Sequence, residues 1–162
     1  MMDRRELTKN EINDLADKYW WKPIYEFPGH FEHRLDKICS RILYCLLRKY
    51  KPKVCMEFGT SAGGTSCVII SALQANGEDF KFVGFEKLES LRKDTETHIE
   101  EKCGQKIEIF GDITENIDKI PQELDFVFID PDWDITKDEN EQDLMDIAKW
   151  TYENIIPRVK QD

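Results

Sequence analysis

The amino-acid sequence predicts an α/β protein with a parallel sheet, and two observations lead to this prediction. Short apolar runs of strand length alternate along the chain with longer segments whose apolar residues recur at intervals of three and four, as on one face of a helix. Proline or glycine follows most of these helical segments and ends them. Strands that alternate with helices are joined by right-handed crossovers, which place the strands parallel in one sheet.

The composition fits one compact domain with a sizeable core. The chain has 162 residues, 40% of them hydrophobic, and its 23 Lys and Arg residues against 33 Asp and Glu give a net charge of −10. An acidic chain repels phosphate backbones, so we expect no non-specific nucleic-acid binding. No apolar run approaches the roughly 20 residues that span a bilayer. No secretory signal pattern follows Met1, so we expect a cytoplasmic protein without membrane contact.

The first part of the chain, residues 1–51, is predicted to be a helical extension or lid. Its clearest element is a helix whose apolar residues lie on one face up to Tyr50, and Pro52 ends that helix. Residues 52–162 are predicted to form the α/β domain itself.

Four strands are predicted in this domain, at Val54–Phe58, Phe80–Glu86, Ile107–Phe110 and Leu124–Asp130. The helices between and after them are predicted at about Cys67–Ala75, Leu88–Cys103, Thr114–Ile120 and Asn140–Ile156. Gly104 is suited to end the second of these helices in a left-handed conformation. The charged side of that helix, which includes Glu96 and His98, is predicted to be a solvated face.

The strongest local motif joins the first strand to its helix: Glu57-Phe-Gly59-Thr-Ser61-Ala-Gly63-Gly64-Thr-Ser66. Glycines at such a turn let the backbone approach a ligand closely, and the free N–H groups of the following helix attract anionic groups. The spacing is not that of a Walker phosphate loop, and Ser61 occupies the second glycine of the dinucleotide pattern. A purely structural role of the glycines, in a tight turn, remains an open alternative.

An acidic residue stands at the end of each predicted strand: Glu57, Glu86, Asp112 and Asp130. The carboxyl ends of parallel strands meet at one edge of the sheet, where ligands bind in open α/β folds. Glu86, after the second strand, is placed to accept hydrogen bonds from the two hydroxyls of a ribose. The four acids together indicate a binding site at this edge.

Taken in order, these segments resemble class I S-adenosylmethionine-dependent methyltransferases from about Lys53 to Pro157. The resemblance implies a Rossmann-like sheet with strand order 3-2-1-4 and S-adenosylmethionine as the cofactor of residues 52–162. It implies that Glu57 orders the cofactor's amino group through water or neighbouring backbone, that Glu86 holds the ribose, and that Asp112 and Ile113 lie near the adenine. The implied contacts to the methionine part are Gly59, Thr60 and Ser61, and Gly63 is a further implied cofactor-binding residue.

The resemblance also implies in-line methyl transfer to an oxygen or nitrogen of a small molecule or nucleobase. Asp130, which is also implied to face the cofactor, is the first candidate for removing a proton from the acceptor, and Asp132 the second. Asp130-Pro131-Asp132-Trp133 is similar to the Asp-Pro-Pro-Trp/Tyr motif of enzymes that methylate nucleobase amines. A divalent ion bound by Asp130 and a neighbouring acid is an open alternative that no ligand spacing specifically indicates.

The sequence departs from this family at its C-terminal side. The family's sheet usually has seven strands, whereas this chain stops after the helix that follows the fourth predicted strand. Two interpretations follow: a truncated chain, or a partner chain or second copy that covers the edge of the fourth strand, because an exposed edge strand invites pairing. The alternative function is therefore a non-catalytic Rossmann-like subunit or scaffold that completes its sheet with a partner chain.

Overall fold

The computed structural model describes residues 10, 37–77, 79–131 and 141–160. Its strands are β1 (Val54–Phe58), β2 (Lys81–Phe85), β3 (Ile109–Phe110) and β4 (Phe126–Ile129). Its α-helices are α2 (Lys37–Tyr50), α3 (Gly64–Asn76), α4 (Glu89–Cys103) and α5 (Glu141–Asn154), and short 3₁₀ turns lie at Ile117–Lys119 and Ile156–Arg158. None of the helices in these ranges is long and apolar enough to cross a membrane.

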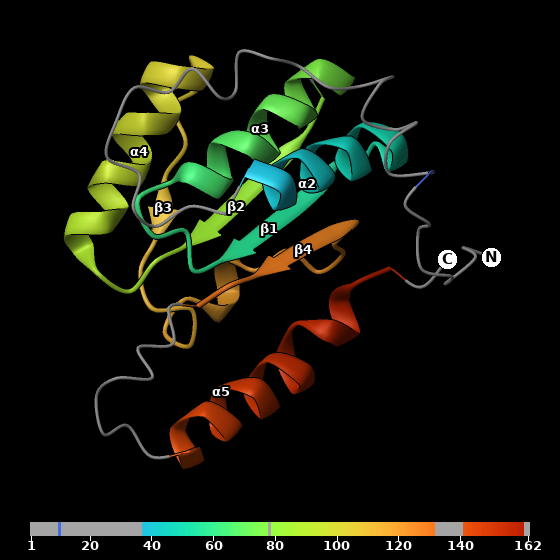
Figure 1. Ribbon diagram of the computed structural model, residues 1–162. Coiled ribbons are helices and arrows are strands. Elements are labelled where there is room, and N and C mark those ends of the chain that lie inside the picture. The colour runs from blue at the N-terminus through green and yellow to red at the C-terminus, as the bar shows by residue number, and fades with distance from the viewer. Residues whose placement is uncertain (1–9, 11–36, 78, 132–140, 161–162) are drawn as a thin grey trace.

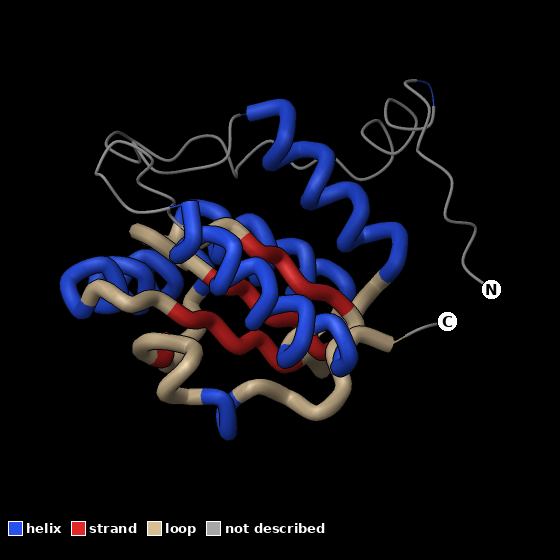
Figure 2. Tube along the Cα trace, turned by 90° about the horizontal axis from the view of Figure 1, so that it is seen from below, coloured by secondary structure: helices blue, strands red, loops and turns tan. Residues whose placement is uncertain are grey.

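The strands described here form one parallel sheet in the order β3-β2-β1-β4, which confirms the predicted topology (Figure 1). Met56 at the centre of β1 pairs with Val83 of β2 on one side and with Val127 of β4 on the other. Seen from below, the strands run side by side in a single layer (Figure 2). The first βα connection therefore lies at the middle of the sheet, beside the ends of both β2 and β4.

Each face of the sheet has its own apolar core, because successive strand residues point to opposite faces. Cys55 and Phe82 join buried residues of α2, α3 and α4 on one face. Met56 and Val83 point the other way and pack with Ile155, just after α5. Figure 1 shows the same division, with α2, α3 and α4 above the sheet and α5 below it.

Helix α2 belongs to the predicted N-terminal extension, and it packs into the domain. Leu43, Tyr44 and Leu47 are buried in the same core as α3. Its C-terminal end is tied to α3, because Asn76 Nδ2 donates to the carbonyl oxygen of Leu47 over 2.9 Å. This helix therefore forms part of the helical layer that covers the sheet.

The third strand is shorter than predicted, because its pairing with β2 begins only at Ile109. The N–H of Ile109 points away from β2 and donates to Oε1 of Glu96 on α4 over 2.9 Å. Glu96 is half-buried, so the prediction that it lies on a solvated face is wrong.

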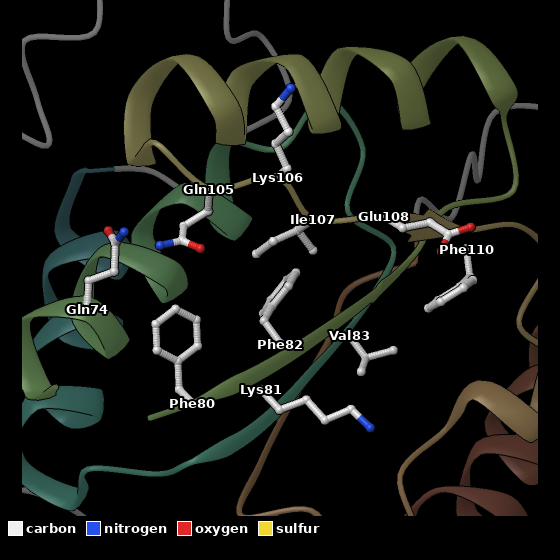
Figure 3. A pocket seen from close by; sticks show the side chains of 10 residues that line it. All are labelled: Gln74, Phe80, Lys81, Phe82, Val83, Gln105, Lys106, Ile107, Glu108 and Phe110. Carbon is white, nitrogen blue, oxygen red and sulfur yellow. The ribbon is translucent and has the colours of Figure 1, made fainter. Parts of the chain in front are cut away.

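A cavity of about 660 Å³ opens between the start of β2 and the chain that leads into β3 (Figure 3). Its lining comprises Gln74, Phe80, Lys81, Phe82, Val83, Gln105, Lys106, Ile107, Glu108 and Phe110.

Beyond α5 the chain returns to the outer edge of β4. Val159 forms a parallel bridge with Leu124, in which the N–H of Leu124 donates to Arg158 O over 2.8 Å and the N–H of Lys160 to Leu124 O over 2.9 Å. The ammonium of Lys160 also lies 2.7 Å from Oδ1 of Asp125. Residues 158–160 therefore run beside the start of β4 as a fifth parallel strand would.

Candidate functional site

The glycine-rich loop, Gly59–Gly63, turns back across the end of β2. The N–H groups of Gly59 and Thr60 both donate to the carbonyl oxygen of Phe85, over 2.9 and 3.2 Å. The N–H of Gly63 donates to Thr60 O over 2.8 Å and closes the turn, and α3 starts at the next residue. The end of β1, the end of β2 and the start of α3 thus meet at the loop.

Ser61 is the strained residue of this loop. Its φ is +47°, a left-handed conformation that costs a residue with a side chain about 1–2 kcal/mol. Its N–H donates to Oε2 of Glu86 over 2.9 Å, which helps to hold that conformation. Its hydroxyl oxygen is buried and has no hydrogen-bond partner within the described residues.

Glu86 lies at the end of β2 and faces the glycine-rich loop. Only 9% of the residue is exposed. Oε2 accepts the N–H of Ser61, and Oε1 accepts the N–H of Leu88 over 2.9 Å. An ionised carboxylate offers about four lone-pair positions, so these two bonds leave it able to accept further donors such as ribose hydroxyls.

Glu57, at the end of β1, is completely buried. The hydroxyl of Ser66 donates to its Oε2 over 2.6 Å, whereas Oε1 has no partner within the described residues. Burial raises the pKa of Glu57 to about 8; the Ser66 hydrogen bond opposes this rise, and the negative charges of Asp130 and Glu86 add to it. At neutral pH the free protein therefore holds this carboxyl mostly in its protonated form.

The residues present fit a ligand that carries hydrogen-bond donors. Glu57 Oε1 and Ser61 Oγ are both buried, both without a partner in the described part of the chain, and both belong to the first βα connection. An unsatisfied buried polar group costs about 1–3 kcal/mol, which a ligand with matching groups would recover. An ammonium group would pair with Glu57 once its carboxyl loses the proton, and a hydroxyl group could donate to Ser61 Oγ.

Two positions of the loop, Gly59 and Gly63, require glycine because other parts of the chain pack against them. A Cβ on Gly59, whose φ is +87°, would lie 2.3 Å from the carbonyl oxygen of Asp130. A Cβ on Gly63 would lie 2.9 Å from Cα of Thr95. The close approach predicted for a ligand is thus made, at these two positions, by the end of β4 and by α4.

The residues predicted near the adenine follow β3, and their side chains point to different surroundings. Asp112 Oδ1 accepts hydrogen bonds from both the N–H and the hydroxyl of Thr114, and Lys87 Nζ lies 3.8 Å from Oδ2. Partial burial raises the pKa of Asp112, but these bonds and the Lys87 charge outweigh it and leave that pKa below its usual value. The side chain of Ile113 is buried in the core on the α5 side of the sheet, so only its backbone can contact a ligand.

Asp130 is exposed at the end of β4, directly across from the loop. Its N–H donates to the carbonyl oxygen of Phe58 over 2.9 Å, which fixes its backbone beside the end of β1. Asp132 lies outside the described residues, as do residues 11–36 of the predicted lid segment. Within the described ranges, no group of three or more His, Cys, Asp or Glu side chains is placed to hold a metal ion.

Two residues of α4 that the sequence did not place at the site contact the glycine-rich loop. The hydroxyl of Thr95 donates to Ser61 O over 2.6 Å, and Nδ1 of His98 lies 2.6 Å from Ala62 O. The prediction that His98 lies on a solvated face is therefore wrong. Thr95 and His98 share one face of the helix with the apolar Leu91, and this spacing was the signal in the sequence that they could face the rest of the domain.

Comparisons with known proteins bear on the fold. No protein-family model matches the chain, and no curated protein sequence matches it. Solved structures do match. An O-methyltransferase from Bacillus cereus in complex with SAH superposes with a TM-score of 0.59 and 16% identity, covering 94% of this chain and 64% of its own. The fold is that of class I methyltransferases.

Two further structures agree. An SAH-bound methyltransferase from Podospora anserina gives a TM-score of 0.59 at 13% identity, covering 87% of this chain and 56% of its own. The O-methyltransferase TomG from Streptomyces achromogenes, in complex with SAM, gives 0.56 at 16% identity, covering 92% of this chain and 61% of its own. The chain thus spans between 56% and 64% of the length of these three methyltransferase-fold proteins.

Proposed function

We propose that this methyltransferase-fold protein binds S-adenosylmethionine at the glycine-rich loop and transfers its methyl group, in line, to an oxygen or nitrogen of a small molecule or nucleobase. The observation that carries the proposal is the unpartnered oxygen of Glu57, buried at the end of β1 where the cofactor's ammonium would need an acceptor. The bound cofactor supplies an activated methyl group on a positively charged sulfur.

Different residues of this chain would bind different parts of the cofactor. Glu57 would accept the ammonium group and Ser61 a second polar group, because each has a buried oxygen without a partner in the described residues. Glu86 would accept the ribose hydroxyls while it continues to hold the loop. The adenine would contact Oδ2 or the backbone of Asp112, and the backbone of Ile113. Gly59, Thr60 and Gly63 fix the path of the loop.

Methyl transfer needs an acceptor held in line and, for a hydroxyl or ammonium acceptor, a group that takes its proton. Asp130 is the candidate, because it is exposed beside the loop and carries a carboxylate. Asp132 is the second candidate from the sequence.

Isothermal titration with SAH, the unreactive product form of the cofactor, tests the proposal. We expect wild-type protein to bind SAH and Glu57→Gln to bind it at least ten-fold more weakly. Because Glu57 is protonated in the free protein at neutral pH, a glutamine mimics its resting state and should leave the fold intact. Glu108→Gln, a matched change at an exposed carboxylate beside the cavity of Figure 3, should bind as wild type. A folded wild-type protein that does not bind SAH would overturn the proposal.

A second candidate function, a scaffold that completes its sheet with a second copy of the chain, is favoured by the outer edge of β4. Within the described residues this edge is paired only at the Leu124–Val159 bridge, and Ile129 is 38% exposed. Sedimentation velocity tests it: a dimer that Ile129→Lys dissociates would support pairing at this edge, because a charge on an edge strand blocks such pairing. A monomer at all concentrations would contradict it.

A further inference from the structure

Helix α4 holds two consecutive carbonyl groups of the glycine-rich loop. The hydroxyl of Thr95 donates to Ser61 O, and Nδ1 of His98 lies 2.6 Å from Ala62 O. A carbonyl oxygen can only accept, so the imidazole of His98 carries its proton on Nδ1 and donates. The helix residues lie 34 and 36 positions after their partners, so both are tertiary contacts.

The single hydroxyl proton of Thr95 makes its bonding pattern specific. Thr95 Oγ1 lies 2.6 Å from Ser61 O, 2.9 Å from Leu91 O and 3.3 Å from Oγ1 of Thr60. If the proton goes to the nearest carbonyl, that of Ser61, then Oγ1 is free to accept the hydroxyl of Thr60. Thr95 is completely buried, and Gly63 packs against its Cα.

The loop needs this support because its central residue is strained. Ser61 has a left-handed backbone without being glycine. Its N–H is held by Glu86 on one side, and its carbonyl by Thr95 on the other. With the carbonyl released, the residue would relax toward an ordinary conformation, and its buried hydroxyl would leave the site.

We propose that Thr95 and His98 are positioning residues, which set the glycine-rich loop in the conformation that binds the cofactor. The inference rests on the proposed function, since the loop is the proposed cofactor site. Neither residue is assigned to contact the cofactor: both act through the backbone of Ser61 and Ala62.

The test compares SAH affinity and loop mobility across matched variants of the full chain. Thr95→Val removes the hydroxyl at nearly constant shape, and Thr95→Ser restores it. Thr97→Val is the control, because Thr97 is exposed on the same helix and its hydroxyl makes the same kind of bond to a helix carbonyl, that of Lys93, at 2.8 Å. His98→Leu removes the second donor, and His98→Asn keeps a donor near the position of Nδ1.

We expect Thr95→Val and His98→Leu to bind SAH at least ten-fold more weakly, and Thr95→Ser, His98→Asn and Thr97→Val within about three-fold of wild type. Without ligand, the amides of Ser61 and Gly63 should exchange hydrogen about ten-fold faster in the two weakened variants, while that of Val83 in the sheet stays unchanged. A general loss of stability would speed all three amides.

The outcomes are distinct. Wild-type affinity in both Thr95→Val and His98→Leu would overturn the positioning role and leave the proposed function standing. Weakened binding with unchanged exchange at Ser61 would also overturn it, because the loop would not have moved. Failure of the wild-type protein to bind SAH would instead overturn the proposed function. Should Thr95→Val not fold, His98→Leu, at a half-buried position, decides the question with the same two measurements.

Discussion

The backbone N–H of Ser61 donates to the carboxylate of Glu86 over 2.9 Å, so the residue proposed to hold the ribose also holds the loop proposed to hold the methionine. The two parts of the proposed site are therefore coupled. A change at Glu86 should disturb both ligand contacts and loop geometry, even before any ligand is bound.

Substitution of Glu86 should accordingly weaken cofactor binding, and the loss should grow with the number of acceptor oxygens removed. Glu86→Gln replaces one acceptor oxygen by an amide NH₂, which cannot accept from both Ser61 and Leu88; we expect about ten-fold weaker SAH binding in calorimetry. Glu86→Ala removes both acceptors and should also destabilise the fold by about 1–3 kcal/mol in urea titration. Glu89→Gln is the control, because Glu89, the first residue of α4, carries an exposed carboxylate three residues after Glu86. Unchanged SAH affinity in Glu86→Ala would remove Glu86 from the site.

The buried carboxyl of Glu57 should make stability depend on pH. Its pKa is about 8 in the folded protein and near 4.5 when exposed in the unfolded chain. Its contribution is fully present below pH 4.5 and is lost as pH rises to about 8, because over that window only the folded state keeps the proton. The free energy of unfolding of wild type relative to Glu57→Gln should therefore fall by up to about 1.4 kcal/mol per pH unit. Urea titrations between pH 5.5 and 8.5 measure this difference, and a flat difference would contradict it.

The same carboxyl should release a proton when the cofactor binds. An ammonium group pairs with an ionised carboxylate, so binding at pH 7 requires Glu57 to lose the proton that burial makes it keep. Calorimetry with SAH in buffers of different ionisation enthalpy should report close to one proton released at pH 7 and fewer above pH 8.5. Proton uptake, or none in wild type at pH 7, would mean that Glu57 is not the ammonium acceptor.

Much of the fold could be predicted from the sequence because the pattern of apolar residues changes from helix to strand period at each element. The order of the strands and the left-handed Gly104 after α4, at a φ of +65°, follow the prediction. The hydrogen bond from the N–H of Ile109 in β3 to Glu96 of α4 could not be predicted. Such a contact joins two elements and leaves no mark in local periodicity.

The candidate site shows the same limit. Glu57, Glu86, Asp112 and Asp130 could be placed at one edge because each ends a strand, and strand ends meet in a parallel sheet. Thr95 and His98 were missed because they lie within a charged helix, where polar residues are ordinarily solvated. What distinguishes them is contact with carbonyl groups 34 and 36 residues earlier in the chain. Only the packing of α4 across the glycine-rich loop creates that contact.

Asp130 should matter for turnover and little for cofactor affinity. Asp130→Asn keeps the shape of the side chain and removes its ability to take a proton, so methyl transfer should fall by about 10²–10⁴-fold. The measurement is transfer of a labelled methyl group to a panel of hydroxyl- and amine-bearing small molecules, beside SAH calorimetry. We expect the SAH affinity of the variant to stay within about three-fold of wild type. Equal losses of turnover and affinity would reassign Asp130 to cofactor binding.

Gly59 should be intolerant of any side chain, for a reason separate from its backbone angle. A Cβ there would lie 2.3 Å from Asp130 O, so Gly59→Ala must force the ends of β1 and β4 apart. Gly104→Ala is the matched control, because Gly104 also has a positive φ, +65°, but nothing lies within 4 Å of its added Cβ. The control should lose about 1–2 kcal/mol for the left-handed alanine alone, and Gly59→Ala about 1–3 kcal/mol more for the overpacking. Urea titration of both variants measures the difference; equal losses would mean that the strand ends separate without cost and that the approach of Asp130 to the loop is not a fixed feature of the site.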